Sequence, residues 1–510
     1  MTTHFDAATV AVPQDEWERQ RRAAVGPASW VNPVPREPYQ LVIVGAGSAG
    51  VAAAELAVTL GARVALVERH LLGGTCFNTG CVPSKALLRT AAVYAQMRDA
   101  ARYGAQPPAA IAVDFPAAMA RLRRIRSHLA GTVSVRHLVD LGVDVFFGNA
   151  QFAGPQTLAV NGQPLQFGKA LIATGARPQI PDLPGLKQAG FLTNANVFDL
   201  TELPPRLLVI GGGPLGCELA QAFERFGSKV TIVQNLPLFL PHEERDAAQT
   251  LSEAFARDGI EVRLNTGVVE VRVEGNEKVV DLVTDDYHSS VRVDAILTGV
   301  GRIPNVQGLA LETAGIDYDE ATGITVDDHL RTSNPRVFAA GDVCLEAKFT
   351  DIAEESARIG VRNALLAGRG RLSERVVPWC TYTDPEIAHV GLYVREANAR
   401  GIPIKTFTIP MHQVDRAITD SEQDGFVKLH VGEGSDRILG ATIVSRDAGD
   451  MISQVTLAMV AGVGLRTLAK VIHAYPTKTE AIREAAMAYN RRRLSGRLLA
   501  RLRRCLPGGQ

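Results

Sequence analysis

Cysteine is scarce in this sequence, unbalanced charge is absent, and long apolar runs are missing. Six cysteines in 510 residues are too few for a disulfide-stabilised scaffold. Lys plus Arg and Asp plus Glu both number 54, so no net field attracts nucleic acid or anionic lipid. No apolar run approaches the roughly 20 residues that span a bilayer, and the N-terminus lacks the basic start and apolar core of a secretory signal. We therefore expect a cytoplasmic protein that binds no nucleic acid and has no transmembrane segment.

The length and the remaining pattern predict several folded domains, because 510 residues exceed what one compact core holds. Two stretches each predict a β-α-β unit. The first runs from a strand at 41–44 through GAGSAG and an alanine-rich helix to a strand that ends at Glu68. The second runs from a strand at 207–210 through GGGPLG to a strand that ends at Gln234, with the same 23-position spacing. Two dinucleotide folds in one chain predict two dinucleotides.

Each unit contains a glycine fingerprint, and the two sets are Gly45, Gly47 and Gly50, and Gly211, Gly213 and Gly216. The first glycine permits a tight turn, the second admits a pyrophosphate, and the third lets helix pack on strand. The helix N-terminus then attracts the phosphates. Glu68 is placed to bind ribose hydroxyls. Gln234 stands at the equivalent position in the second unit. A glutamine would not repel a 2′-phosphate, which favours NADPH as the second dinucleotide. Alternatively, Gln234 hydrogen-bonds a ribose diol and NADH is the electron donor.

The sharpest pattern is GGTCFNTGCVPSK at 73–85. Cys76 and Cys81 can close a small disulfide if Cys81 begins a helix, and Pro83 suits the first turn of that helix. A thiol at a helix N-terminus has a lowered pKa and is available for exchange, and Lys85 adds positive charge one turn later. A zinc site is the alternative, but no second Cys/His pair of suitable spacing accompanies it. The sequence therefore predicts a redox-active cysteine pair.

Three further segments are weaker signals. ATGARP at 173–178 and AAGD at 339–342 are strand-to-turn glycine segments, and Asp342 could instead cap a following helix. In HAYPTKTE at 473–480, the Pro–Thr turn and Glu480 aim the preceding side chain, that of Tyr475, two residues after His473. Tyrosine can donate a hydrogen bond but is a poor base at neutral pH. Packing at an interface is the alternative role of Tyr475.

The two ends of the chain lie outside these patterns. The first 38 residues are rich in proline and charge without periodicity, and we expect an arm that packs on the body through Trp17 and Trp30. The last 21 residues contain seven arginines and leucines spaced by four, which predicts an amphipathic basic helix. That helix could contact a membrane surface or a partner, or be a frayed terminus.

Together the motifs resemble the class I pyridine nucleotide–disulfide oxidoreductases, which include dihydrolipoamide dehydrogenases, glutathione reductases and mercuric reductases. GGTCFNTGCVPSK, GGGPLGCE, GRIPN (301–305), SNPRVFAAGD and TDPEIAHVG (383–391) occur in the family's order, and the resemblance covers about residues 39–490. It implies an α/β fold with two Rossmann-like dinucleotide-binding domains, for FAD and NAD(P), and a C-terminal α+β dimerisation domain. The expected divisions are an arm at 1–38, the FAD domain at 39–200 and 300–375, the NAD(P) domain at 201–299, the dimerisation domain at 376–488 and a basic tail at 489–510.

The resemblance also implies individual roles. Cys81 would face the flavin and Cys76 would attack the acceptor. Lys85 would lie by the flavin N5 and pair with Glu218. The FAD would be held by Asp342 at the ribityl chain and by Glu68 at the adenosine ribose. In a homodimer, Tyr475 and Glu480 would reach the partner's cysteines. Further cofactor contacts are expected at Gly74, Thr75, Ala173, Thr174, Gly175, Gly301 and Gly341.

Several departures bear on the electron acceptor. Disulfide reductases of the family carry His where Tyr475 stands, whereas mercuric reductases carry Tyr. Mercuric reductases typically end in a vicinal cysteine pair, and many begin with a GMTCxxC domain; this sequence has only Cys505 in its tail and no such motif at its start. Pro214 stands where some relatives carry a tyrosine lid over the flavin.

The sequence predicts electron flow from NADPH or NADH through FAD to Cys76–Cys81, and then to Hg(II) or another soft metal ion bound by thiolates. One alternative is a reductase of small-molecule or protein disulfides, with His473 or Tyr475 handling the proton. A second is an FAD-binding protein without turnover. No structural metal site is expected.

Overall fold

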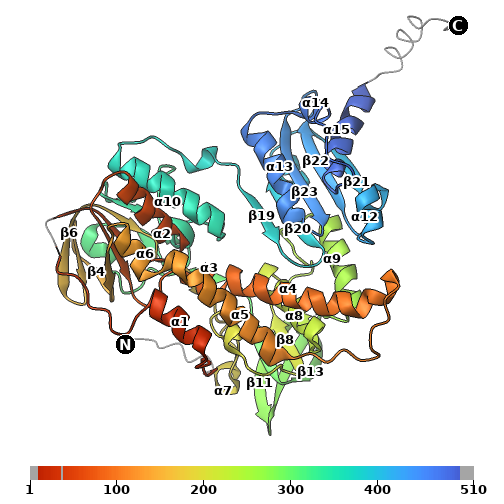
Figure 1. Cartoon of the computed structure of the whole chain (residues 1–510), viewed down its shortest axis with the longest axis horizontal. Helices are drawn as coiled ribbons and strands as arrows, with labels where there is room; N and C mark the ends of the chain where they lie inside the picture. The colour runs from red at the N-terminus through yellow and green to blue at the C-terminus, as the bar shows by residue number, and fades with distance from the viewer. Residues whose placement is uncertain (1–9, 36–37, 494–510) are drawn as a thin grey trace, which may run out of the picture. The chain divides into compact units, whose positions relative to one another are not determined.

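The structure, a computed structural model, describes residues 10–35 and 38–493. It divides into two compact units, Met1–Pro237 with Gly259–Glu374, and Leu238–Asp258 with Arg375–Gln510 (Figure 1). Residues 238–258, which the sequence analysis assigns to the NAD(P) domain, group with the second unit. The domain boundaries given above therefore stay predictions. The basic helix expected beyond residue 493 lies outside the described residues.

The first β-α-β unit lies at the centre of the larger sheet of the first unit. Its elements are β1 (Tyr39–Val44), α2 (Ser48–Thr59) and β2 (Val64–Glu68). Parallel neighbours complete this layer, namely β3 (Asp144–Phe147), β6 (Gln163–Ile172) and β18 (Val337–Ala339). Val42 pairs with Ala65 on one side and Ala170 on the other. The apolar run at 41–44 is buried, as expected for a central parallel strand.

Helices cover this sheet, and a hairpin extends it. α10 (Thr350–Leu365) packs beside α2 (Figure 1). β4 (Ala150–Gly154) and β5 (Thr157–Val160) continue from β6 in antiparallel fashion. Further helices of the first unit are α3 (Gly74–Thr79), α4 (Cys81–Arg98), α5 (Phe115–Leu129), α6 (Val135–Asp140) and α7 (Leu186–Ala189).

The second β-α-β unit repeats the first. Its parallel sheet has the order β10 (Glu261–Arg263), β9 (Lys229–Val233), β8 (Arg206–Ile210), β14 (Ala295–Thr298), and α8 (Pro214–Phe226) follows β8. β9 ends one residue before Gln234, where the sequence predicts the strand end. An antiparallel sheet adjoins it, formed by β11 (Thr266–Glu274), β12 (Glu277–Thr284) and β13 (Tyr287–Val293). The strand pair β7 (Ala176–Pro178) and β15 (Arg302–Pro304) is also antiparallel.

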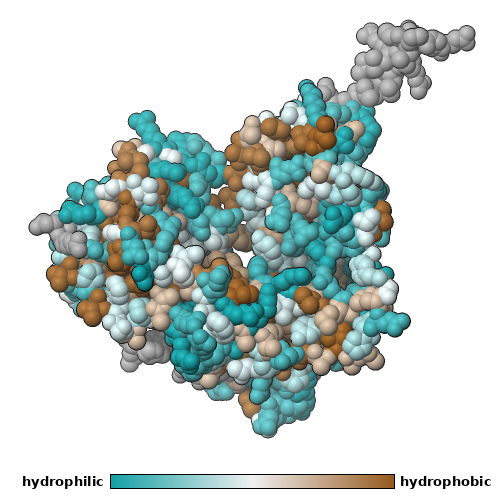
Figure 2. Space-filling model, in the orientation of Figure 1, coloured by the Kyte–Doolittle hydropathy of each residue, from teal (hydrophilic) through white to brown (hydrophobic). Residues whose placement is uncertain are grey.

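The second unit is an antiparallel fold of the α+β class, and α+β is the class that the family resemblance implies for residues 376–488. Its five strands have the order β19 (Pro378–Thr381), β20 (Glu386–Gly391), β23 (Ile438–Ser445), β22 (Phe426–Gly432), β21 (Ile404–Pro410). Its helices are α9 (Arg245–Asp258), α11 (Val394–Ala399), α12 (Asp415–Thr419), α13 (Ala448–Val460), α14 (Leu465–Leu468) and α15 (Glu480–Arg493). Apolar surface gathers over α13 and α14 in Figure 2, where Leu457, Val460 and Ile472 are exposed.

The N-terminal arm is more ordered than its sequence indicates. Residues Glu16–Val25 form helix α1, which lies along α5 (Figure 1). Trp30 packs edge-on against Phe147, and its indole N–H donates to the carbonyl of Val145 at 3.2 Å, as the expected packing requires. Among the described residues, no helix combines the length and apolar character needed to cross a bilayer.

Candidate active site

The two cysteines lie on either side of a break between two helices. Cys76 is on the short helix α3, and Cys81 is the first residue of α4, as the sequence predicts. Gly80 separates the helices, and Pro83 occupies the first turn of α4. Cys81 therefore lies at a helix N-terminus, where free backbone N–H groups stabilise a thiolate.

Close backbone contact fixes the cysteine segment against the first glycine turn. Gly74 has φ +57°, and a Cβ placed there would come within 2.6 Å of the Gly47 Cα. No residue with a side chain fits at this position without moving one of the two loops. The local sequence GG before the cysteine therefore sets the segment beside the turn that begins helix α2.

The two thiols act on each other's pKa. Both are free thiols in the structure. The neighbouring Cys76 is the main cause that lowers the pKa of Cys81, with contributions from Thr350 and from the charge of Lys85. The Sγ of Cys81 lies 3.4 Å from the Thr350 hydroxyl. The neighbouring Cys81 raises the pKa of Cys76, so the surroundings favour Cys81 over Cys76 as the thiolate of the reduced pair.

Lys85 and Glu218 form the ion pair that the resemblance implies. The Lys85 Nζ donates to both carboxylate oxygens of Glu218, at 2.8 and 3.0 Å. Glu218 is 3% exposed on α8, so it depends on this partner for its charge. Lys85 lies one turn after Cys81 on α4, and its ammonium favours the Cys81 thiolate, whereas Glu218 opposes it.

The glycine turns have the shape that a dinucleotide requires. Gly45 and Gly211 have φ of +100° and +101°, and a Cβ on Gly50 or Gly216 would collide with the carbonyl oxygen of its respective turn at 1.8 or 2.3 Å. The backbone N–H of Ala46 donates to the Glu68 carboxylate at 2.8 Å, which ties the end of β2 to the turn. The two units are near-identical in local geometry, so both fit a bound dinucleotide.

Arg302 is a site residue that the sequence analysis missed. Its Nε lies 3.3 Å from a carboxylate oxygen of Asp342, and its guanidinium donates to the carbonyl of Ala176 at 2.6 Å and reaches the Thr75 hydroxyl at 3.5 Å. Within the described part of the chain, the buried Nε has no hydrogen-bond partner of good geometry. A polar group left in this state fits a site that receives a polar ligand.

The surroundings of Asp342 also decide one open question. α10 begins at Thr350 with Phe349 as its N-cap, so the alternative that Asp342 caps the next α-helix is wrong. Burial raises the pKa of Asp342, and Arg302 opposes that rise. The ATG turn is fixed separately, since the Thr174 hydroxyl donates to the carbonyl of Asn305 at 2.7 Å. Gly301 and Gly341 both adopt positive φ beside these groups.

Thr350 and Ser48 were also missed. The Thr350 hydroxyl lies 3.4 Å from the Cys81 Sγ, and Thr350 and Ser48 both act to lower the pKa of Cys76. Ser48 stands inside the GAGSAG turn, so its place next to a glycine fingerprint could have suggested it. Thr350 is 269 positions from Cys81 and follows no motif, so only the fold reveals it.

The remaining predicted residues belong to the second unit. The Tyr475 hydroxyl donates to Asp415 at 2.8 Å, and the ring is 71% exposed. The hydrogen bond to Asp415 raises the pKa of Tyr475, which makes it a donor rather than a base. His473 lies two residues away with its Nε2 2.7 Å from the Gln454 amide nitrogen. Glu480 is the first residue of α15.

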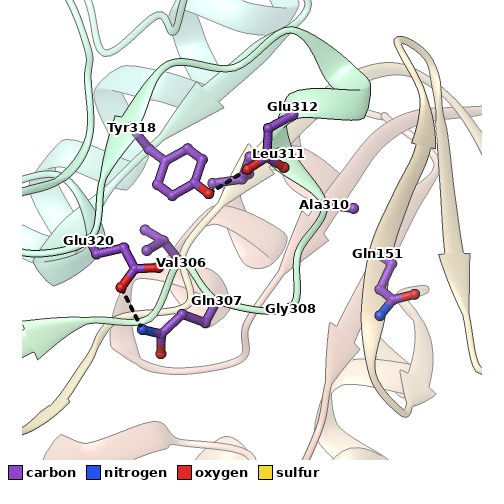
Figure 3. Close-up of a pocket in the computed structure, with 9 residues that line it drawn as sticks. All are labelled: Gln151, Val306, Gln307, Gly308, Ala310, Leu311, Glu312, Tyr318 and Glu320. Carbon is purple, nitrogen blue, oxygen red and sulfur yellow. Dashed lines mark hydrogen bonds between the residues drawn. The ribbon is translucent and has the colours of Figure 1, made fainter. Parts of the chain in front are cut away.

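Two further observations limit where chemistry occurs. A cavity of about 360 Å³ lies beside β4 on the first unit, but Figure 3 shows four of its polar side chains paired with one another, Tyr318 with Glu312 and Gln307 with Glu320. In the part of the chain that the structure describes, no three His, Cys, Asp or Glu side chains are grouped to hold a metal ion. Among the described residues, the cysteine pair is therefore the reactive group that both sequence and geometry support.

Comparison with known proteins identifies the family. The pyridine nucleotide–disulphide oxidoreductase profile matches residues 39–362, and the dimerisation domain of the same family matches 377–486. This chain therefore belongs to the pyridine nucleotide–disulphide oxidoreductases, flavoproteins that use FAD and NAD(P)H. The fold class, the family and the cofactors expected from the sequence are confirmed.

The relatives differ in their reactions. A mercuric reductase of Staphylococcus aureus is 34% identical over 459 residues, 89% of this chain and 83% of the relative. A dihydrolipoyl dehydrogenase of Thermus scotoductus is also 34% identical, over 89% of this chain and 98% of the relative. The solved HOCl-induced flavoprotein disulfide reductase RclA of Escherichia coli has a TM-score of 0.79 at 32% identity and covers 88% of this chain and 99% of RclA.

Proposed function

We propose that this flavoprotein disulfide oxidoreductase transfers electrons from NADPH through FAD to the Cys76–Cys81 pair and on to a soft metal ion, of which Hg(II) is the best candidate. FAD, held at the first glycine turn and by Glu68 and Asp342, would supply the electron-transfer chemistry between the nicotinamide and the disulfide. Every other part of the reaction falls to residues of this chain.

The charged residues of the site and the two cysteines have distinct roles in the reaction. The ion pair of Lys85 with Glu218 orients the ammonium beside the start of α4. Cys81 holds the negative charge of the reduced pair, and Cys76 keeps its proton, because the two neighbouring thiols move each other's pKa in opposite directions. Cys76 is then the thiol that meets the acceptor, and it releases its proton to water when its sulfur binds the acceptor.

Tyr475 is the observation that favours a metal ion over a disulfide. Thiol exchange with a disulfide needs a base near neutral pH to take the thiol proton. Tyr475 is held as a hydrogen-bond donor by Asp415, and its raised pKa excludes that role. A metal ion needs only thiolate ligands, and soft thiolates bind Hg(II) and Cu(I) tightly. RclA, whose structure has also been solved as a Cu(II) complex, extends the candidates to copper.

A reductase of disulfides is the second candidate. Dihydrolipoyl dehydrogenases share as much identity with this chain as mercuric reductases do. His473 would have to supply the base, from a position two residues before Tyr475 and hydrogen-bonded to Gln454.

An acceptor panel separates the candidates. We expect the purified holoprotein to oxidise NADPH at least tenfold faster with Hg(II) than with oxidised glutathione, lipoamide or a protein disulfide. Cys76→Ser and Cys81→Ser should each abolish that activity. If a disulfide drives rapid NADPH oxidation and Hg(II) drives none, the protein is a disulfide reductase. If no acceptor drives NADPH oxidation, the protein binds FAD without turnover. Running the panel with NADH in parallel tests the choice that Gln234 favours.

Tyr475 offers a matched variant. In a homodimer the Tyr475 hydroxyl would reach the partner's cysteines as a hydrogen-bond donor and help to position an ion on their sulfurs, so Tyr475→Phe should lower kcat with Hg(II) at least tenfold. Tyr287→Phe, at an equally exposed tyrosine on β13, serves as the control and should not change kcat. Equal rates for both variants would exclude the Tyr475 hydroxyl from the reaction.

We also propose that the enzyme acts as a homodimer through its second unit. Leu457 and Val460 on α13 are 68% and 67% exposed, and Ile472 is 92% exposed. Such a cluster is unusual on a free surface. Light scattering should give twice the chain mass, and Leu457→Lys with Val460→Lys should halve it.

A further inference from the structure

The N-terminal helix α1 turns a charged face towards the protein interior. Asp15 caps the helix by accepting from the backbone N–H of Glu18 at 2.9 Å. The side chains of Glu18 and Arg21 are then 1% and 4% exposed, although both are ionic. Charged residues are almost never buried this far without specific partners. Because two of the three buried side chains of this helix are charged, it lacks the apolar periodicity by which a buried helix face is predicted from sequence.

Arg21 connects this face to the cysteine segment. Its Nε and Nη2 donate to the two carboxylate oxygens of Glu18 at 2.9 and 2.5 Å. Its Nη1 donates to the side-chain oxygen of Asn78, which lies two residues after Cys76 on α3. The planar fork of the guanidinium therefore bonds two side chains at once.

Asn78 passes this connection to the start of α3. Its side-chain nitrogen donates to the carbonyls of Leu72 and Gly74, both at 2.9 Å. These carbonyls flank the tight Gly73 turn that precedes Cys76. The backbone N–H of Leu72 in turn donates to the carbonyl of Val25 at the end of α1, at 2.8 Å. The arm thus contacts the loop before the cysteine at two places.

A second buried arginine holds the other end of α3. The Arg126 Nη1 donates to the backbone carbonyl of Asn78 at 2.9 Å, in the last turn, where helix carbonyls lack internal partners. Its Nη2 lies 3.7 Å from Glu18 and 3.6 Å from Asp199. Two carboxylates thus balance the charge of two buried guanidinium groups around one short helix. Arg126 Nε and Nη2 make no hydrogen bond among the described residues, so the hydrogen bonds of Arg21, Asn78 and the Arg126 Nη1 are what restrain the helix.

We infer that Arg21 is a positioning residue for the redox reaction: through Asn78 it holds α3 so that Cys76 stays within bonding reach of Cys81. The family profile begins at residue 39, so Glu18 and Arg21 lie in a part of the chain that the family match does not cover. The inference rests on the proposed redox role of the two cysteines.

The rigidity has a measurable chemical consequence. Reduction by glutathione consumes the Cys76–Cys81 disulfide and two glutathione thiols, and yields two protein thiols and one glutathione disulfide. The equilibrium constant reports the effective concentration of Cys76 towards Cys81, which depends on how firmly the two sulfurs are held in place. A loosened α3 lowers that concentration and makes the disulfide easier to reduce.

The test compares two adjacent arginines that share one partner. Arg22 pairs with the same Glu18 oxygen at 2.8 Å but is 46% exposed, so Arg22→Ala is the control for Arg21→Ala. The holoprotein is equilibrated in glutathione buffers, and the oxidation state of Cys76 is read by alkylation and peptide mass. Arg21→Ala should lower the effective concentration about tenfold, which corresponds to about 30 mV. Arg22→Ala should stay within twofold of the wild type.

Arg21→Lys covers the outcome in which Arg21→Ala does not fold. Lysine keeps the buried positive charge for Glu18, but a single ammonium cannot bond both Glu18 and Asn78 as the fork does, so a shift of at least threefold is expected. Equal equilibrium constants for the Arg21 and Arg22 variants would overturn the inference and leave the proposed function intact. A wild-type protein whose two cysteines never form a disulfide would instead overturn the proposed function.

Discussion

Neutralising the two members of the buried ion pair should shift the pKa of the Cys81 thiol in opposite directions. Lys85 lowers that pKa and Glu218 raises it, because one charge stabilises a thiolate and the other repels it. Lys85→Met should therefore raise the pKa of Cys81, and Glu218→Gln should lower it. A purely structural role of the pair predicts no such opposition.

The size of the shifts follows from the geometry. A single charge a few ångströms away typically moves a pKa by 1–3 units. Here the two charges partly cancel, since the Lys85 Nζ lies 2.8 Å from a carboxylate oxygen of Glu218. The Lys85 side chain is also about one third exposed, so solvent screens its charge. We therefore expect roughly one unit in each direction, a tenfold change in thiolate at a fixed pH below the pKa. Lys85→Met should also destabilise the fold by about 1–3 kcal/mol, because the buried Glu218 carboxylate loses the ammonium that donates to both of its oxygens.

The assay follows the alkylation rate of Cys81 against pH in the reduced holoprotein, with the modified peptide identified by mass. Cys217 and Cys344 do not interfere, since burial raises the pKa of both thiols. Lys187→Met, at an exposed lysine on α7, is the control for loss of a positive charge and should leave the profile unchanged. Shifts of the same sign in the Lys85 and Glu218 variants, or no shift in either, would refute the electrostatic argument.

Two more predictions concern burial and close contact. Burial lowers the pKa of His389 to about 3, below its unfolded value of 6.5, so the unfolded chain binds the extra proton and stability falls as pH drops below about 6.5. Between pH 7 and 5 this costs about 2 kcal/mol, and in urea titrations His389→Gln should reduce that pH dependence whereas His412→Gln, at an exposed site, should not. Gly50→Ala should give protein without bound flavin, because its Cβ would lie 1.8 Å from the Gly45 carbonyl oxygen; Gly131→Ala, with open space around it, should stay yellow. A flavin-replete Gly50→Ala protein would show that the turn tolerates a side chain.

The sequence was informative wherever function depends on local backbone geometry. Both fingerprints and the helix start at Cys81 were predicted, because each is encoded within a few consecutive residues, and the α+β class of the C-terminal domain was predicted as well. The exact end of β9 and the helix in the arm were not. The arm helix has a charged buried face, and a pattern search that expects apolar residues inside cannot detect it.

The chain by itself determined that two dinucleotides and a cysteine pair belong to one protein, since glycines with positive φ and cysteines at a helix start are required by the local chain path. Only the tertiary structure decided which distant groups act on that pair. Thr350 reaches Cys81, Arg302 bridges Thr75 and Asp342, and Arg21 reaches Asn78 across 57 positions. Such contacts depend on how separate elements pack, and no spacing in the sequence records a distance between elements that meet only after folding.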